Sequence, residues 1–242
     1  MAFYGRELAH VHDAGFGDFA RAAAPGLLRR IARAGAQNGL VVDLGCGSGI
    51  WARVLTDAGY GVLGIDVSQA MLAIARRRAP RARFVRGSAL EVELPRCSAV
   101  TAIGECLSYA NESRTGIGAL RVVFRRVRRR LGPGGTFLFD VATPGREGAT
   151  PRRGWHAGAD WVLCLDAAED QARRELVRQI TVFRRDGRAW RRTDEVHRLA
   201  LYEPAAVLGL LADCGFEARR LRGYGPELRF PRGLAGFAAT RR

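Results

Sequence analysis

Short apolar segments alternate with segments of helical periodicity between residues 39 and 141. Five segments read as strands because they are short and rich in apolar residues, at 39–44, 61–66, 83–86, 99–103 and 136–141. Strands that alternate with helices build a parallel sheet, since each crossover helix returns the chain to the same edge. We therefore predict an α/β fold with a doubly wound, mostly parallel sheet and helices on both of its faces.

Local signals mark where the intervening helices begin and end. Residues 50–58 have helical spacing, and Gly59 suits a C-terminal cap. Ser68 is placed to cap a helix that runs to about Ala79 and stops at Pro80. The clearest apolar stripe of a later helix recurs every three to four residues, at Ile117, Leu120, Val123, Phe124, Val127 and Leu131.

The rest of the chain is expected to surround this parallel core. The N-terminal 35 residues read as helical, with a break at Pro25-Gly26. Residues 155–202 alternate as roughly three antiparallel strands, and Asp186-Gly187 is a strong hairpin signal. We predict a single domain, 1–242, built from an N-terminal helical cap (1–35), a parallel core (36–142), an antiparallel β insertion (155–202), and a last helix with the last strands (203–242).

A glycine-rich turn, Gly45-Cys-Gly47-Ser-Gly49, joins the first strand to the next helix. Such a turn brings backbone N–H groups close to a ligand. Asp66 ends the second strand, where a carboxylate accepts hydrogen bonds from ribose hydroxyls in nucleotide-binding folds. Asp43 precedes the turn and would repel a pyrophosphate, and residue 50 is Ile where the dinucleotide fingerprint has glycine. The turn therefore favours a cofactor with a cationic end over NAD.

Three segments together resemble the class I S-adenosylmethionine-dependent methyltransferase family. They are 41–49 (VVDLGCGSG), 64–72 (GIDVSQAML) and 131–135 (LGPGG). The resemblance is strong over about 38–142, and its order of motifs is specific. It implies a seven-stranded sheet whose last hairpin is reversed, with S-adenosyl-L-methionine as cofactor and S-adenosyl-L-homocysteine as product.

The resemblance also implies a set of cofactor-binding residues. Gly45, Cys46 and Gly47 would line the methionine part, Asp66 would take the ribose, and Val67 and Met71 would flank the adenine. Many members carry an aspartate after a glycine beyond the third strand, whereas this chain has Ser88 followed by Ala89. The remaining candidates are Tyr4, Asp43, Gly49, Ile103 and Gly104.

The antiparallel insertion is similar in architecture to that of small-molecule N-methyltransferases, in which such a sheet roofs the active site. We therefore expect transfer of a methyl group to an N or O atom of a small molecule. Two alternatives stay open: an RNA methyltransferase, and a protein that binds the cofactor without catalysis. The insertion's apolar residues need cover, from the core or from a second subunit, so a homodimer is also expected; they are Trp161, Leu163, Ile180, Val182 and Trp190.

Methyl transfer needs an aligned, uncharged or deprotonated nucleophile, and a carboxylate or neutral histidine is the natural proton acceptor. Glu105 follows the fourth strand directly, where ligands bind in α/β folds. Tyr109 lies four residues further on and could hydrogen-bond or box an amine. His197 lies in the insertion, and the pattern of its neighbours does not show which face of the sheet carries its side chain. These three residues are the catalytic candidates.

Charge and cysteine content bear on partners and location. The net charge is +15, but all 39 basic residues are arginine, and few aromatic residues accompany the arginine runs. Binding of nucleic acid is therefore not expected. The five cysteines are far apart and form no CxxC pair, so we expect no metal site and a reduced, cytoplasmic protein. No secretion signal or membrane span is apparent.

Overall fold

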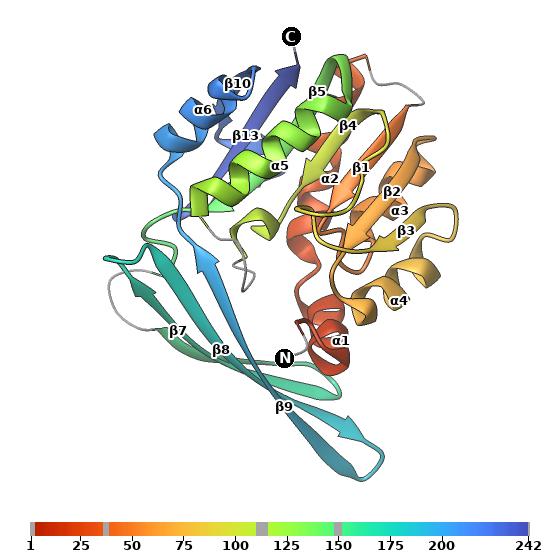
Figure 1. Cartoon of the computed structure of the whole chain (residues 1–242). Helices are drawn as coiled ribbons and strands as arrows, with labels where there is room; N and C mark the ends of the chain where they lie inside the picture. The colour runs from red at the N-terminus through yellow and green to blue at the C-terminus, as the bar shows by residue number, and fades with distance from the viewer. Residues whose placement is uncertain (1–2, 36–38, 110–115, 148–151, 242) are drawn as a thin grey trace.

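The protein is built on a seven-stranded sheet with the strand order β10-β13-β5-β4-β1-β2-β3, seen in a computed structural model (Figure 1). The structure describes residues 3–35, 39–109, 116–147 and 152–241. β1 to β5 run parallel, and β13 lies antiparallel to both β5 and β10. This confirms the predicted parallel core and the reversed last hairpin. The strands are β1 (Leu40–Leu44), β2 (Gly61–Asp66), β3 (Arg83–Arg86), β4 (Cys97–Ala102), β5 (Leu131–Ala142), β10 (Phe216–Leu221) and β13 (Leu234–Arg241).

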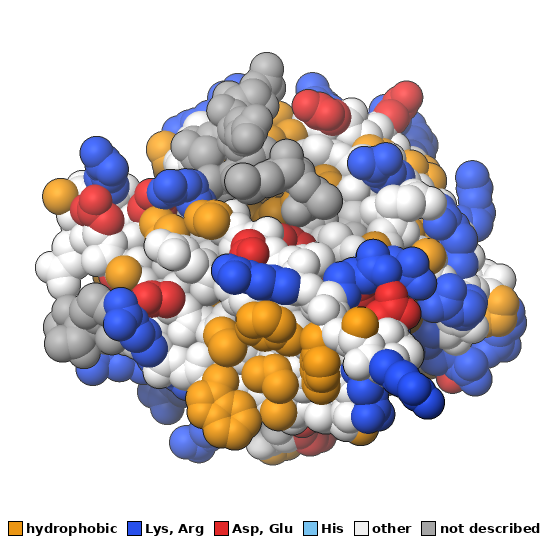
Figure 2. All heavy atoms as spheres, turned by 90° about the horizontal axis from the view of Figure 1, so that it is seen from below, with side chains coloured by type: hydrophobic (Ala, Val, Ile, Leu, Met, Phe, Trp, Pro, Cys, Tyr) orange, Lys and Arg blue, Asp and Glu red, His pale blue; other side chains and the backbone are white. Residues whose placement is uncertain are grey.

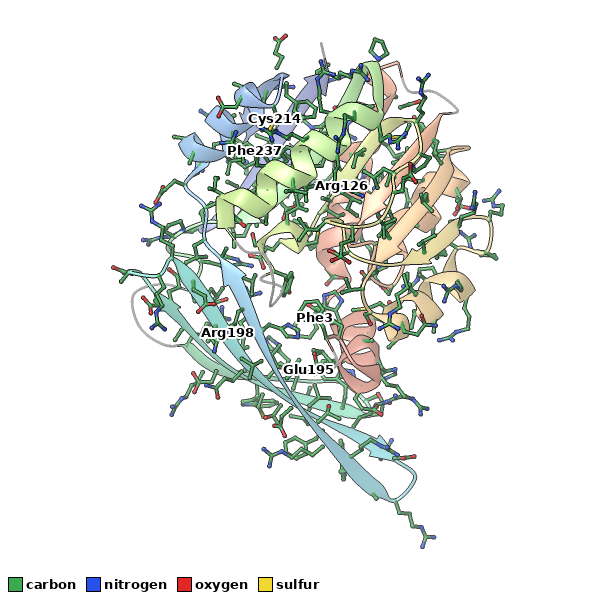
Figure 3. The ribbon with its side chains drawn as sticks, viewed as in Figure 1. Phe3, Arg126, Glu195, Arg198, Cys214 and Phe237 are labelled. Carbon is green, nitrogen blue, oxygen red and sulfur yellow. The ribbon has the colours of Figure 1, made fainter. Side chains whose placement is uncertain are left out.

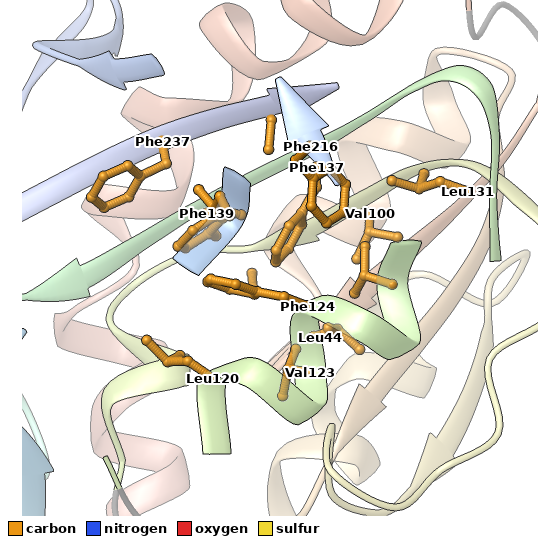
Figure 4. Close-up of a cluster of buried hydrophobic side chains, with 14 of the residues drawn as sticks. Leu44, Val100, Leu120, Val123, Phe124, Leu131, Phe137, Phe139, Phe216 and Phe237 are labelled. Atoms are coloured by element: carbon orange, nitrogen blue, oxygen red, sulfur yellow. The ribbon is translucent and has the colours of Figure 1, made fainter. Parts of the chain in front are cut away.

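Helices cover both faces of this sheet, and each face has its own hydrophobic core. On one face, Phe124 of α5 packs with Phe137 and Phe139 of β5 (Figure 4). On the other face, Leu27 of α2 and Trp51 of α3 lie in a second buried cluster. The helices are α1 (Arg6–Gly15), α2 (Asp18–Arg33), α3 (Ile50–Asp57), α4 (Gln69–Arg78), the short 3-10 helix η1 (Cys106–Ser108), α5 (Gly116–Arg130) and α6 (Pro204–Asp213).

Most predicted helix ends are confirmed, because they depend on local chemistry. The Ser68 hydroxyl accepts the Met71 N–H at 3.1 Å, and Gly59 follows α3 with a φ of +87°. Ile117 departs from the predicted stripe, because it lies in the first turn of α5 with 44% of its surface exposed.

The predicted helix break at Pro25-Gly26 is wrong. Pro25 lies inside α2, and the chain bends instead between Gly15 and Gly17, where α1 ends and α2 begins. A Cβ on Gly26 would lie 2.4 Å from the Tyr224 carbonyl oxygen, so the helix packs tightly on the segment before β13. That packing outweighs the local preference of proline. The same segment holds an unpredicted hairpin, β11 (Gly223–Gly225) and β12 (Leu228–Arg229).

The insertion forms a separate four-stranded antiparallel sheet below the parallel core (Figure 1). It has one strand more than predicted, and Asp186-Gly187 makes the expected hairpin, with Gly187 at a φ of +63°. Trp161, Leu163, Ile180 and Val182 are buried against α1, as expected. Trp190 is 52% exposed, which corrects the prediction, because it alternates onto the outer face. The strands are β6 (Arg152–Ala157), β7 (Trp161–Asp170), β8 (Glu175–Asp186) and β9 (Ala189–Ala200).

Two boundaries of the predicted organisation, residues 36 and 242, and the chain start Met1-Ala2 lie outside the described residues. None of the helices in the described part of the chain is both long enough and apolar enough to span a membrane.

Candidate active site

A cavity of about 520 Å³ opens at the carboxyl ends of β1, β2 and β4, between the parallel core, α1 and the antiparallel sheet. The residues of the glycine turn, the end of β2 and the segment after β4 all line it. Every candidate cofactor residue lies on its wall except Gly49, and so do the catalytic candidates Glu105 and Tyr109. His197 is absent from the wall. The structure thus brings together residues that are up to about 100 positions apart in the chain.

The glycine turn is held in shape by Asp66. Its carboxylate accepts the Gly47 N–H and the Ser68 N–H, both at 2.8 Å. Gly45, Gly47 and Gly49 all have positive φ, which favours glycine. A Cβ on Gly49 would lie 2.9 Å from the Ala75 Cβ, so this glycine lets α3 approach α4 closely. A Cβ on Gly47 would meet no atom within 4 Å, so its backbone borders open space.

Asp43 lies beneath the turn as a buried carboxylate. It is 1% exposed and accepts a hydrogen bond from the Thr101 hydroxyl at 2.7 Å. The Trp51 indole N–H in turn donates to Thr101 at 3.1 Å. Burial raises the pKa of Asp43 to about 7; the Thr101 hydrogen bond opposes this rise and the charge of Asp66 adds to it. A cation beside the turn would favour the ionised form of Asp43.

The segment after β4 is positioned by Asp140 of β5, which the sequence prediction did not include. The Gly104 N–H and Glu105 N–H donate to its carboxylate at 2.9 and 2.6 Å, and the Tyr224 hydroxyl donates at 2.7 Å. Burial raises the pKa of Asp140 to about 6, although all three hydrogen bonds lower it. Glu105 consequently adopts a φ of +63°, uncommon outside glycine. The signal available in the sequence was an acid inside the apolar segment Phe137–Ala142.

The Glu105 side chain is buried and fully engaged by arginines. One carboxylate oxygen contacts the Arg146 Nε, and the other lies 3.1 Å from the Arg178 Nη1. Arg178 also reaches Glu147 at 3.1 Å. Burial opposes the charge of Arg178, but the neighbouring acids outweigh it and raise its pKa. Both oxygens of the Glu105 carboxylate are therefore in contact with guanidinium groups.

The N-terminal segment closes the cavity against the antiparallel sheet. Glu195 of β9 accepts the Tyr4 and Gly5 N–H groups, both at 2.8 Å, while Ser68 donates to the Tyr4 carbonyl at 2.7 Å. The Tyr4 and Tyr109 hydroxyls are 3.0 Å apart. Figure 3 shows Phe3 and Glu195 between α1 and the sheet.

His197 lies behind this closure, whereas His12 of α1 lines the cavity. The His197 Nε2 is 2.9 Å from the Glu195 carboxylate, and its ring packs 4.6 Å from Phe3, centroid to centroid. The His197 Nδ1 is buried and has no hydrogen-bond partner among the described residues. Burial lowers the pKa of His12 to about 4, so that imidazole is neutral near pH 7.

Ser88 follows Gly87 after β3, where the family resemblance predicts an aspartate. Its hydroxyl accepts the Leu90 N–H at 3.2 Å and therefore stabilises the turn after β3. Ser88 and Ala89 both line the cavity. This part of the cavity wall thus offers a hydroxyl and backbone groups rather than a carboxylate.

Comparisons with known proteins match this architecture. Residues 41–135 match the family model described as a methyltransferase domain. The trans-aconitate 2-methyltransferase of Delftia acidovorans is 38% identical over 131 residues, which cover 52% of this chain and 45% of that protein. The chain thus matches less than half the length of this relative.

Solved structures resemble the chain over nearly its whole length. An S-adenosylmethionine-dependent methyltransferase from Clostridium acetobutylicum superimposes with a TM-score of 0.81 at 16% identity, covering 96% of this chain and 97% of that one. A sugar N-methyltransferase from Streptoalloteichus sp. gives 0.79 at 21% identity, covering 100% and 97%. At these identities the likeness concerns the fold. The match to the methyltransferase-domain model, over residues 41–135, and the strand order agree with this fold.

Proposed function

We propose that the protein transfers the methyl group of S-adenosylmethionine to an N or O atom of a small molecule. The observation that carries this proposal is that the glycine turn, the end of β2 and residues of the antiparallel sheet all line one cavity. The residues present suit the cofactor, because a buried carboxylate lies under the turn and a second one ends β2. Bound S-adenosylmethionine supplies an electrophilic methyl group on a cationic sulfonium.

The chain's own residues would hold, align and enclose the reactants. We propose that Gly45, Cys46 and Gly47 contact the methionine part, with Ile103 and Gly104 near the sulfonium. Asp66 would accept the ribose hydroxyls, and Val67, Met71, Ser88 and Ala89 would surround the adenine. Tyr4 would cover the cofactor through its ties to Glu195 and Ser68. Alignment in a closed cavity is worth about 7–11 kcal/mol of the barrier, so no strong general base is needed.

The three catalytic candidates take different proposed roles. Tyr109 lines the cavity and would contact the acceptor. Glu105 would order the acceptor side through Arg146 and Arg178 rather than remove a proton. His197 would support Tyr4 and Tyr109 from behind.

The proposal is tested by incubating the protein with S-adenosylmethionine labelled in the methyl group and a panel of small amines, alcohols and carboxylic acids. Label in one acceptor, with a matching amount of S-adenosylhomocysteine, is expected. The same protein is offered total RNA. Binding of S-adenosylhomocysteine without turnover of any acceptor would favour the cofactor-binding alternative, and labelling of RNA alone would favour the RNA methyltransferase.

We also propose that the chain functions as one domain and associates as a homodimer through the outer face of the antiparallel sheet. Figure 2 shows a hydrophobic patch on the side viewed from below. Trp155, Trp190 and Val196 lie on this outer face and are 70%, 52% and 45% exposed. Covering such a patch is favourable by about 25 cal/mol per Å². Sedimentation should give a dimer that Val196→Arg dissociates, and a monomeric wild type would contradict this interface.

We propose a reduced, cytoplasmic location and no nucleic-acid partner. All five cysteines are free thiols, and the basic residues near the cavity are paired with acids. Fluorescence of a tagged protein in its host, with fractionation, tests the location.

A further inference from the structure

Five charged side chains form a chain of alternating sign on the acceptor side of the cavity. Arg146 contacts Glu105, Glu105 contacts Arg178, Arg178 contacts Glu147, and Glu147 lies 3.6 Å from Arg152. They come from four separate places: the segment after β4, the segment after β5, β6 and β8. All five line the cavity. Glu105 directly follows Gly104, so the chain begins next to the proposed transfer point.

The positive charges in this chain of ion pairs outnumber the negative charges. Three arginines and two glutamates leave a net charge of 3 − 2 = +1. Both oxygens of Glu105 contact a guanidinium group, whereas one oxygen of Glu147 lies 3.1 Å from Arg178 and the other, which has no hydrogen-bond partner among the described residues, lies 3.6 Å from Arg152. An ammonium group entering the cavity here would therefore meet an excess of positive charge, and both oxygens of Glu105 would already be in contact with arginines.

The arginines keep unused hydrogen-bond donors. Among the described residues, Arg146 uses its Nε in this chain, and Arg178 uses one bond from each terminal nitrogen. A guanidinium group has further N–H groups, arranged in a fork that matches an oxyanion in two-point contact. Arg178 is held almost out of solvent, with 13% of its side chain exposed, so its unused donors gain more from an anion than those of a surface arginine.

We infer that the methyl acceptor carries an oxyanion group, a carboxylate or a phosphate, which is bound by Arg146, Arg178 and Arg152 beside Glu105. This inference rests on the proposed function and names its substrate class. Glu105 and Glu147 keep the three guanidinium groups from repelling one another and fix their directions before the acceptor arrives. The fixed geometry favours an oxyanion over a neutral alcohol of the same size.

The test measures acceptor-side binding apart from turnover. Protein saturated with S-adenosylhomocysteine is titrated calorimetrically with citrate, benzoate, inorganic phosphate and, as the cationic counterpart of benzoate, benzylamine. At least one anion should bind, and benzylamine should not. The tighter class, carboxylate or phosphate, identifies the group. If S-adenosylhomocysteine itself fails to bind, the proposed function fails before this inference is reached.

Three variants make the test specific. Arg146→Gln should weaken anion binding by about tenfold or more, since bonds to charged partners are lost. Arg152→Gln should weaken it less and is safe for folding, because its side chain is 63% exposed. Arg29→Gln is the matched control. Arg29 lies on α2, is paired with Glu227 and is not part of the cavity wall, so this variant should leave anion binding unchanged.

Four results would overturn the inference. They are a lack of binding by every anion, preferential binding of benzylamine, equal weakening by Arg29→Gln, and a loss of S-adenosylhomocysteine affinity in Arg146→Gln with anion affinity intact. The last result would assign the arginines to the carboxylate of the cofactor. Retained binding of either S-adenosylhomocysteine or the anion shows that a variant is folded.

Discussion

Asp43→Asn should stabilise the cofactor-free protein and at the same time weaken its binding of S-adenosylmethionine. Asp43 is buried on β1, and burial raises its pKa from 3.8 to about 7. The ionised carboxylate is therefore unfavourable in the folded protein until a cation lies beside it. Asparagine carries no charge but keeps an oxygen that can accept the Thr101 hydroxyl.

The size and sign of the effect follow from the pKa difference. At about 1.4 kcal/mol per pH unit, a rise from 3.8 to about 7 makes ionised Asp43 unfavourable by roughly 4 kcal/mol. Between these two values the folded protein keeps a proton that the unfolded chain has lost, so wild-type stability falls as the pH rises and levels off above about 7. The gain from Asp43→Asn should therefore be larger at pH 8 than at pH 5 by about 2–3 kcal/mol.

Urea unfolding of both proteins without cofactor, at about pH 5 and about pH 8, measures this difference. The comparison between pH values cancels the fixed penalty of burying an amide, about 1–3 kcal/mol. Calorimetry should show a greater loss of affinity for S-adenosylmethionine, which is cationic at sulfur, than for S-adenosylhomocysteine. An equal stability change at both pH values would refute the reasoning on burial, and equal losses for the two ligands would refute the pairing with the sulfonium.

Four further results are expected. Asp66→Asn should lower S-adenosylhomocysteine affinity about tenfold or more with unchanged circular dichroism; an unchanged dissociation constant would remove the ribose assignment. S-adenosylhomocysteine should raise the melting temperature and NAD should not, and the reverse would point to a dinucleotide site. Glu195→Ala removes the acceptor for two N–H groups, so amide exchange at Tyr4 and Gly5 should accelerate and cofactor affinity should fall. Unchanged exchange would disprove that Glu195 holds the N-terminal segment against the antiparallel sheet. Glu105→Gln should lower kcat more than cofactor affinity, whereas His197→Ala should mainly lower the stability of the fold. Steady-state kinetics, with cofactor binding measured in parallel, test both expectations. If kcat changes by less than about threefold in both variants, alignment of the reactants alone accounts for catalysis.

The part of the cavity wall that we assign to the cofactor could be predicted from the sequence because its signals are local. Asp43, the three glycines and Asp66 lie on two neighbouring strands and the turn between strand and helix, and parallel pairing brings their ends together. Ser68 was recognisable as a cap for the same reason. The break assigned to Pro25 failed because α2 is held by contacts with a segment about 200 residues away, which no local propensity describes.

The acceptor half depends on strand register, and register is set by the fold as a whole. Arg178 is one of 39 arginines, and nothing in its immediate neighbours marks it. Its partners Glu105 and Glu147 lie 73 and 31 residues away. The alternation of residues along β8 does mark Arg178. Leu176, Ile180 and Val182 are buried on one face of the strand, and Arg178 occupies the same face. A charge in the apolar phase of an alternating strand must find a partner on burial, since an unpaired buried charge is costly. Arg184 repeats the pattern and pairs with Glu7 of α1 at 2.9 Å. Charged residues on the inward face of this sheet therefore mark positions that need an ion-pair partner, and of these two arginines Arg178 lines the cavity.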